Sequence, residues 1–134
     1  MSNVEIVATI QQAIKDQNLW AVVRHLDPDI RWAVDTSDRS AAPWFADFRG
    51  RQGVLAFFEA LSANELQSFE VKDVVGDGDT VMAWIHVAYR TPNGGLVDMD
   101  EVQVWELSGG KVQAVTLFPD TLQIVQALAY RAGD

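Results

Sequence analysis

The 134-residue chain carries 19 acidic and 10 basic residues, giving a net charge of −9, and it contains no cysteine. This charge disfavours binding to nucleic acid or to an anionic membrane surface, because both are polyanions and the sequence has no basic stripe. The lack of cysteine excludes disulfides, thiolate zinc sites and a cysteine nucleophile. No apolar run approaches the ~20 residues that cross a bilayer. We therefore expect a cytoplasmic protein with one domain over residues 1–134.

Three helices and one strand are predicted in the N-terminal half of the chain. Ser2 and Glu5 form a capping-box pattern before apolar residues at helical spacing, which predicts a first helix. Asn18 is a suitable cap for a second, short helix, which should end before Pro28 because the residue preceding a proline disfavours helical dihedral angles. The segment DIRWAV then predicts a strand. Residues 35–49 predict an irregular loop with inward-turned aromatic side chains, and residues 52–63 predict the third helix.

The C-terminal half is predicted to form four strands and a short helix. After residue 65 the spacing of apolar residues changes from 3.6 to 2, which is typical of strands. Turn signals at residues 76–79, 92–95 and 108–110 separate the strands and indicate an antiparallel meander. Pro119 ends the last strand, and Asp120 can cap a final helix. This order of elements predicts the α+β class, with helices on one face of a curved sheet.

Four segments carry a family resemblance, namely LDPDIRWAV, FRGRQGVLAFFEAL, VVGDGDTVMAWI and VWELSGGKVQAVTLFPD. In this order they resemble the SnoaL-like branch of the nuclear transport factor 2 (NTF2)-like superfamily, which includes ketosteroid isomerase. The resemblance covers nearly the whole chain. It implies a cone, in which a strongly curved mixed sheet wraps around three N-terminal helices and opens at its wide end, where enzymes of the family have their active site. It also implies a homodimer formed through the outer face of the sheet.

Polar residues within the apolar strands are candidates for chemistry. A period of 2 places Glu101, Gln103 and Trp105 on one face of their strand, and Trp84 and His86 on one face of the preceding strand. We expect these five side chains to converge on the interior of the cone. There His86 and Glu101 would pair as a catalytic base and its orienting group. Two structural alternatives remain open: Glu101 and Gln103 can lie on the solvated side of an edge strand, and His86 can be a buried core residue.

Two aspartates are further catalytic candidates through the resemblance. The proton-shuttling aspartate of ketosteroid isomerase falls on Val34 or Asp35, and a carboxylate that faces an apolar cavity has a raised pKa suited to a general base. Asp120 lies where related polyketide cyclases carry an acid/base aspartate. Each residue also has a structural alternative, because Asp35 can stabilise the turn DTSD and Asp120 can cap the last helix.

The resemblance to ketosteroid isomerase itself is incomplete. That enzyme stabilises its enolate with a tyrosine and a protonated aspartic acid. The tyrosine position falls on Ile10, and the aspartic acid position falls near Val102 or Gln103. None of these is a tyrosine or an aspartic acid, which argues against steroid isomerisation of that type.

The expected function follows from the cone and from its lining. The predicted pocket wall consists of Trp32, Trp44, Trp84, Gln103, Trp105 and Phe118. No two histidines or carboxylates have the spacing of metal ligands, so we predict neither a metal site nor a cofactor. The ligand would be a small apolar or carbonyl-containing molecule, and the reaction an isomerisation, cyclisation or dehydration by proton transfer beside a carbonyl. The alternative is a non-catalytic ligand-binding or dimerisation module on the same fold.

Overall fold

The computed structural model describes residues 1–133, which form four helices and six strands. In chain order the elements are α1 (Asn3–Lys15), α2 (Leu19–Val23), β1 (Leu26–Val34), β2 (Asp47–Arg49), α3 (Gly50–Leu61), β3 (Glu65–Asp77), β4 (Thr80–Arg90), β5 (Leu96–Ser108), β6 (Lys111–Phe118) and α4 (Thr121–Leu128). The strands form one sheet in the order β2-β1-β6-β5-β4-β3. β1 and β6 are parallel and every other pair is antiparallel, so the sheet is mixed.

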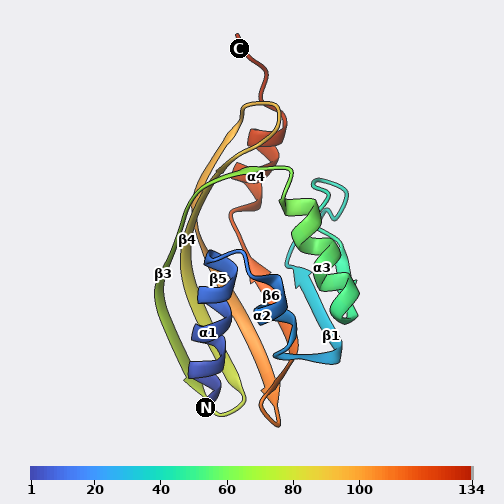
Figure 1. Cartoon of the computed structure of the whole chain (residues 1–134). Helices are drawn as coiled ribbons and strands as arrows, with labels where there is room; N and C mark the ends of the chain where they lie inside the picture. The colour runs from blue at the N-terminus through green and yellow to red at the C-terminus, as the bar shows by residue number, and fades with distance from the viewer. Residues whose placement is uncertain (134) are drawn as a thin grey trace.

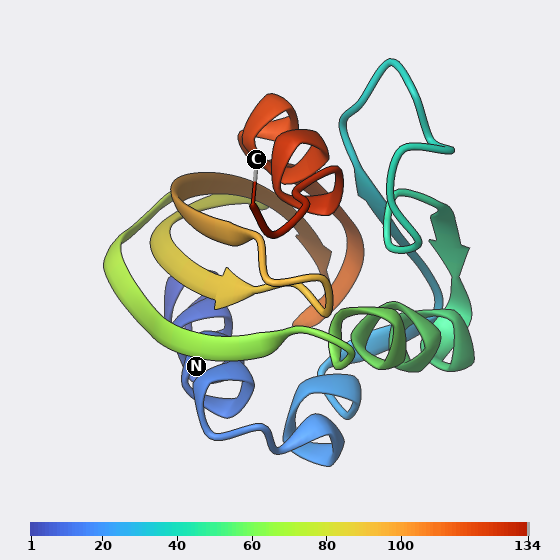
Figure 2. The same ribbon diagram turned by 90° about the horizontal axis from the view of Figure 1, so that it is seen from above.

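The sheet is strongly curved rather than flat. Figure 1 shows the long strands β3, β4 and β5 bending along their length, and Figure 2 shows the same strands as an arc when seen from above. α1 packs against β3 and β4, α3 packs against β1 and β2, and α4 packs against β5. The predicted α+β class, with a curved mixed sheet around the N-terminal helices, is confirmed.

The helix caps agree with the sequence. Ser2 and Glu5 form the predicted capping box at the start of α1. The Asn18 side chain accepts a hydrogen bond from the Ala21 amide and caps α2. The Asp120 side chain likewise accepts from the Gln123 amide at the start of α4. At the start of α1, α2 and α4 a side-chain oxygen thus satisfies a backbone N–H that has no partner within the helix.

Two elements around β1 differ from the prediction. β1 begins at Leu26, earlier than predicted, and Leu26 pairs with Val112 on β6. β2 was predicted as loop, yet it pairs with β1 through registers such as Trp32 opposite Phe48. Both extensions depend on partners distant in sequence. A local pattern therefore does not reveal them.

The β4–β5 hairpin is fastened to α4. The Asn93 side-chain nitrogen donates hydrogen bonds to the carbonyls of Ala127 at 3.0 Å, Leu128 at 3.2 Å and Tyr130 at 2.8 Å. Gly95 lies so close to the helix that a Cβ atom there would be 2.1 Å from the Ala127 carbonyl oxygen. The tip of the hairpin thus caps the C-terminal end of α4. No helix within residues 1–133 is long and apolar enough to span a bilayer.

Candidate functional site

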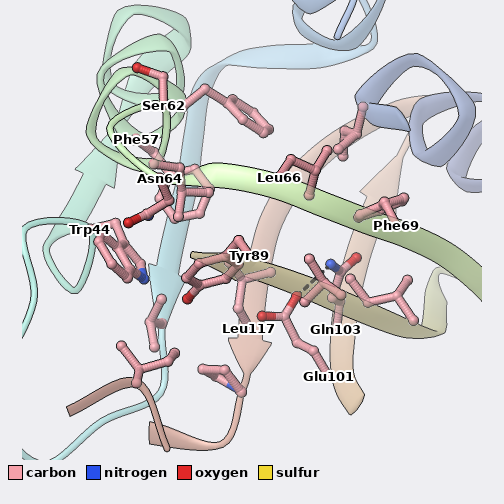
Figure 3. A pocket seen from close by; sticks show the side chains of 18 of the residues that line it. Trp44, Phe57, Ser62, Asn64, Leu66, Phe69, Tyr89, Glu101, Gln103 and Leu117 are labelled. Atoms are coloured by element: carbon pink, nitrogen blue, oxygen red, sulfur yellow. Dashed lines mark hydrogen bonds between the residues drawn. The ribbon is translucent and has the colours of Figure 1, made fainter. Parts of the chain in front are cut away.

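A cavity of about 440 Å³ lies inside the cone. Side chains from β1, α3, β3, β4 and β5 contribute to its wall, together with the loop before β2 and α4. Figure 3 shows this cavity from close by. Its aromatic lining residues are Trp32, Trp44, Phe57, Phe58, Phe69 and Tyr89. Such a wall offers a mainly apolar environment with few polar groups, which is the usual character of a small-molecule site.

Glu101 has the only carboxyl group in this wall among residues 1–133, and a chain of buried and partly buried hydrogen bonds holds it. The Gln103 side-chain nitrogen donates to Glu101 Oε2 at 2.8 Å. Gln103 Oε1 accepts from Gln11 Nε2 at 2.6 Å and from Trp105 Nε1 at 3.1 Å. Gln11 comes from α1, so the first helix and β5 together position the carboxyl group.

The direction of this hydrogen-bond chain is fixed by Trp105. An indole N–H can only donate, so the Gln103 amide must present its oxygen to Trp105. The amide nitrogen of Gln103 must then face Glu101, where it requires an acceptor. Glu101 Oε2 therefore accepts in either protonation state, and the proton of a neutral Glu101 resides on Oε1.

Burial inside the cone raises the pKa of Glu101 to about 7, and the hydrogen bond from Gln103 partly opposes this rise. The physical cause is the loss of water around the charged form, which outweighs one stabilising donor. A carboxyl group with this pKa is present in both its acid and its base form near neutral pH. It can therefore accept and return a proton.

Tyr89 is a polar wall residue that the sequence analysis missed. It is 6% exposed and its ring lies 6.2 Å from that of Trp44. Its hydroxyl is buried and has no hydrogen-bond partner among residues 1–133. Burial and the nearby charge of Glu101 both raise the pKa of Tyr89, so the hydroxyl stays protonated and able to donate. The signal that could have revealed it is its period-2 relation to Ile85 and Val87, which share the inner face of β4.

The predicted convergence of Trp84 and His86 on the interior is wrong. Ile85, not His86, lies opposite Glu101 in the β4–β5 ladder, so Trp84 and His86 point to the outer face. Trp84 is 45% exposed, and its indole donates to Asp100 at 3.1 Å. The proposed His86–Glu101 pair does not form.

His86 instead binds two aspartates on the outer face. Its Nδ1 atom lies 2.6 Å from Asp100 Oδ1, and its Nε2 atom makes a short contact with Asp98. These hydrogen bonds raise the pKa of His86. The exposed cluster belongs to the surface of the sheet and is separate from the cavity.

Neither aspartate candidate lines the cavity. Val34 faces the cavity, whereas Asp35 lies in a separate depression of about 170 Å³ beside Arg31 and Arg39. Asp120 caps α4, as its structural alternative stated. The Asp35 and Asp120 side chains therefore do not share a site with Glu101.

The predicted pocket wall is reproduced in part. Trp32, Trp44 and Gln103 line the cavity. Phe118 is 43% exposed and does not line it, and Trp105 is fully buried behind Gln103 rather than in the wall. No cluster of three or more histidine or acidic side chains within the described part of the chain could hold a metal ion.

Comparison with known proteins identifies a matching family and several similar structures. A family model described as "SnoaL-like domain" matches residues 7–115. An NTF2-like protein of unknown function from Burkholderia pseudomallei has 20% identity and a TM-score of 0.85, over 97% of this chain and 100% of that chain. TerC, solved with polyporic acid, has 16% identity and a TM-score of 0.81, over 96% and 98%. A putative polyketide cyclase from Pseudomonas putida has 18% identity and a TM-score of 0.75, over 95% and 98%. No curated protein sequence matches the chain.

Proposed function

Because the chain belongs to the SnoaL-like domain family, we propose that it binds a small, largely apolar molecule with a carbonyl group and moves a proton beside that carbonyl. One observation carries this proposal. Glu101, with a pKa of about 7, lines an apolar cavity that also contains the protonated hydroxyl of Tyr89. The reaction class is isomerisation, cyclisation or dehydration without a cofactor, in the cytoplasm.

In the proposed mechanism Glu101 is the general base. Its Oε1 atom removes a proton from the carbon beside the carbonyl. The electron pair of the broken C–H bond forms the C=C bond of an enolate, and the π pair of the carbonyl moves onto its oxygen. Tyr89 donates a hydrogen bond to that oxygen as its negative charge develops, an interaction that is strong in a site from which water is excluded. In an isomerisation the protonated Glu101 then returns the proton to another carbon of a conjugated enolate, and the carbonyl re-forms. Gln103 holds Oε2 throughout and keeps the carboxyl group oriented.

The similar structures support a carbonyl-bearing aromatic ligand. TerC was solved with polyporic acid, and the Pseudomonas putida neighbour is named a putative polyketide cyclase. The aromatic wall of this cavity, with Trp32, Trp44 and Phe57, offers flat apolar surfaces for such a molecule. The proposal extends this ligand class to the present chain.

The test is hydrogen–deuterium exchange at the methyl group of 2-acetonaphthone in D₂O, followed by NMR. Wild-type protein should accelerate the exchange, and Glu101→Gln should reduce the acceleration by about 10²–10⁴-fold, the usual contribution of a general base. Glu106→Gln is the matched control, because Glu106 lies on the same strand but is exposed on the outer face. Equal rates in wild type and Glu101→Gln would remove Glu101 from the chemistry.

A second candidate function is ligand binding without catalysis. The observation that favours it is that Glu101 has no second carboxyl or histidine beside it in the cavity wall, within residues 1–133. A binding module would show saturable binding of the ketone, equal in wild type and Glu101→Gln, with no exchange above the buffer rate. The same experiment therefore separates the two functions.

The proposed partner of the chain is a second copy of itself. Two cross-strand rows of apolar side chains lie on the outer face of the sheet. One row contains Val75, Met82 and Val104, and the other contains Trp84, Val102 and Phe118. Several of these side chains are exposed, and an exposed apolar patch of this kind is typical of an interaction surface.

A further inference from the structure

Asn64 is a polar residue of the cavity wall that the proposed mechanism does not use. It lies in the turn between α3 and β3, where its backbone amide donates to the Leu61 carbonyl at 3.0 Å. Its side chain lines the cavity. Figure 3 shows Asn64 and Glu101 on different parts of the wall, with the Tyr89 ring between them in this view.

The side-chain amide of Asn64 has two polar atoms, Nδ2 and Oδ1, and both lack a hydrogen-bond partner among the described residues. Both atoms are buried. A buried polar group without a partner costs roughly 1–3 kcal/mol. Within the cavity wall, the Gln103 amide avoids this cost, because it donates to Glu101 and accepts from Gln11 and Trp105. The unpaired amide of Asn64 thus needs an explanation other than stability of the turn.

We propose that Asn64 is a second recognition point of the cavity, for a neutral ligand group that both donates and accepts hydrogen bonds, such as a hydroxyl or a carboxamide. This inference rests on the proposed function in taking the cavity as the ligand site. The ligand is then bifunctional. Its carbonyl lies at Glu101 and Tyr89, and its second polar group lies at Asn64, with an apolar body between them.

The chemistry of the amide selects the ligand group. Nδ2 donates and Oδ1 accepts, so the complement must supply one acceptor and one donor. A carboxylate only accepts and an ammonium group only donates, so each leaves one end of Asn64 unpaired. A carboxylate is further disfavoured because Glu101 lines the same apolar cavity and the chain carries a charge of −9. An apolar group leaves both ends unpaired.

The first experiment measures the ligand-free protein. Asn64→Leu replaces the amide with an apolar group of similar size, and we expect its melting temperature to equal or exceed that of wild type. The physical reason is that an unpaired polar group is removed from an apolar wall. A fall of several degrees would show that the amide supports the fold, and would overturn the proposal. If the leucine side chain does not fit and Asn64→Leu does not fold, Asn64→Ala replaces it in both experiments, since it deletes the amide without adding bulk.

The second experiment measures selectivity with a matched pair of probes, 6-hydroxy-2-acetonaphthone and 6-methyl-2-acetonaphthone, by quenching of tryptophan fluorescence. Wild type should bind the hydroxy probe about tenfold more tightly, the effect of one or two hydrogen bonds. Asn64→Leu should lose this preference while keeping its affinity for the methyl probe. Gln67→Leu is the control, because it removes an exposed amide that does not line the cavity. Wild type without a preference, or without binding of either probe, would overturn the proposal.

Failure of this inference is distinguishable from failure of the proposed function. The selectivity experiment needs no turnover, and Glu101→Gln should retain the preference for the hydroxy probe. A preference that depends on Asn64, without exchange that depends on Glu101, leaves a binding protein with this recognition point. Exchange that depends on Glu101, without the preference, leaves an enzyme in which Asn64 has another role.

Discussion

Glu101 couples the protonation of the cavity to the stability of the fold. Its pKa is about 7 in the folded chain, above the ordinary glutamate value of 4.5. Between these two values the folded state binds more protons than the unfolded state, so stability decreases as the pH rises through this window. The decrease is about 1.4 kcal/mol per pH unit for one such group. The carboxyl group that suits proton transfer therefore weakens the fold at neutral pH.

We expect Glu101→Gln to be more stable than wild type at pH 8 and nearly equal to it at pH 4. The glutamine carries no charge to desolvate, and its side-chain oxygen can still accept from Gln103. Urea denaturation at several pH values measures the difference, which should grow between pH 4.5 and 7 and then level off. A difference that does not change with pH would contradict the raised pKa.

Gln103 should control the protonation of Glu101. Gln103→Leu removes the donor that stabilises the carboxylate, so the pKa of Glu101 should rise further. The pH profile of ketone exchange would then shift to higher pH, with the base-limited midpoint moving upward. A loss of rate at every pH without a shift in midpoint would indicate that Gln103 acts only on packing.

At the residue scale, the sequence predicted the face of β5 correctly and that of β4 wrongly. On β5, Glu101 and Gln103 line the cavity and Trp105 is buried beside Gln103, on the one face that the period of 2 predicted. β4 has large apolar residues on both faces, such as Ile85 inside and Trp84 outside, so its period does not say which face is inner. The register between the strands decides this question, and no single-strand pattern contains it.

Among the elements, the outer faces of β4 and β5 are joined by a pH-sensitive contact. His86 on β4 contacts Asp98 and Asp100 on β5, and Glu70 on β3 lies opposite it in the ladder. Lys72, also on β3, stands over the Trp84 ring at 5.2 Å. The two aspartates raise the pKa of His86, so this contact stabilises the fold below pH 6.5 and is lost as the pH rises through the raised value.

His86→Gln should therefore lower stability at pH 5.5 and leave it nearly unchanged at pH 9. The charged pair with the aspartates is present only while the histidine is protonated. Thermal unfolding of both proteins at the two pH values checks this. An equal loss of stability at both pH values would attribute the role of His86 to packing rather than to charge.

Asp120 was a catalytic candidate from the sequence, and we expect it to act only as the cap of α4. Asp120→Ala removes the cap of α4 and should cost about 1 kcal/mol, because the Gln123 amide loses its acceptor. Ketone exchange per folded molecule should stay at the wild-type rate, and Asp120→Asn should restore most of the stability. A variant that folds normally but loses exchange would return Asp120 to the catalytic candidates.

Helices, caps and hairpin turns could be predicted because their signals are local. The capping residues Ser2, Asn18 and Asp120 all perform the predicted role. β2 could not be predicted, since its three residues are a strand only through their pairing with β1. Tyr89 was missed for a related reason, because only the register with β5 shows that the face of β4 with Ile85, Val87 and Tyr89 is the inner one.

At the scale of the whole molecule, the proposed homodimer forms through the outer face of the sheet. Trp84→Glu places a charge within the exposed apolar rows and should dissociate the dimer, because two such charges would meet or be buried in the interface. Light scattering coupled to size exclusion measures the mass of each protein. Trp20→Glu is the control, since Trp20 is also exposed but lies on α2. A wild-type mass of a single chain would reject the dimer.

The cone shape was predicted only from the family resemblance, and not from local sequence patterns. The order of elements indicated the α+β class, but the parallel pairing of β1 with β6 joins residues about eighty positions apart along the chain, such as Trp32 and Val115. Nothing local in either segment specifies that pairing. The cavity depends on it, because it brings Trp32 on β1 into the same wall as Glu101 on β5.

The contacts of Asn93 and Gly95 with α4 limit which insertions and permutations the β4–β5 hairpin can tolerate. The hairpin tip and the helix end are matched in length, since one amide reaches three carbonyls and a single glycine leaves no room for a side chain. An insertion in the tip would require a matching change in the helix. Opening the chain at the tip by circular permutation would break the contacts between the hairpin and the end of α4. Ile124 on α4 lines the cavity, so a change that loosens these contacts should also move the cavity wall without replacing any residue of it.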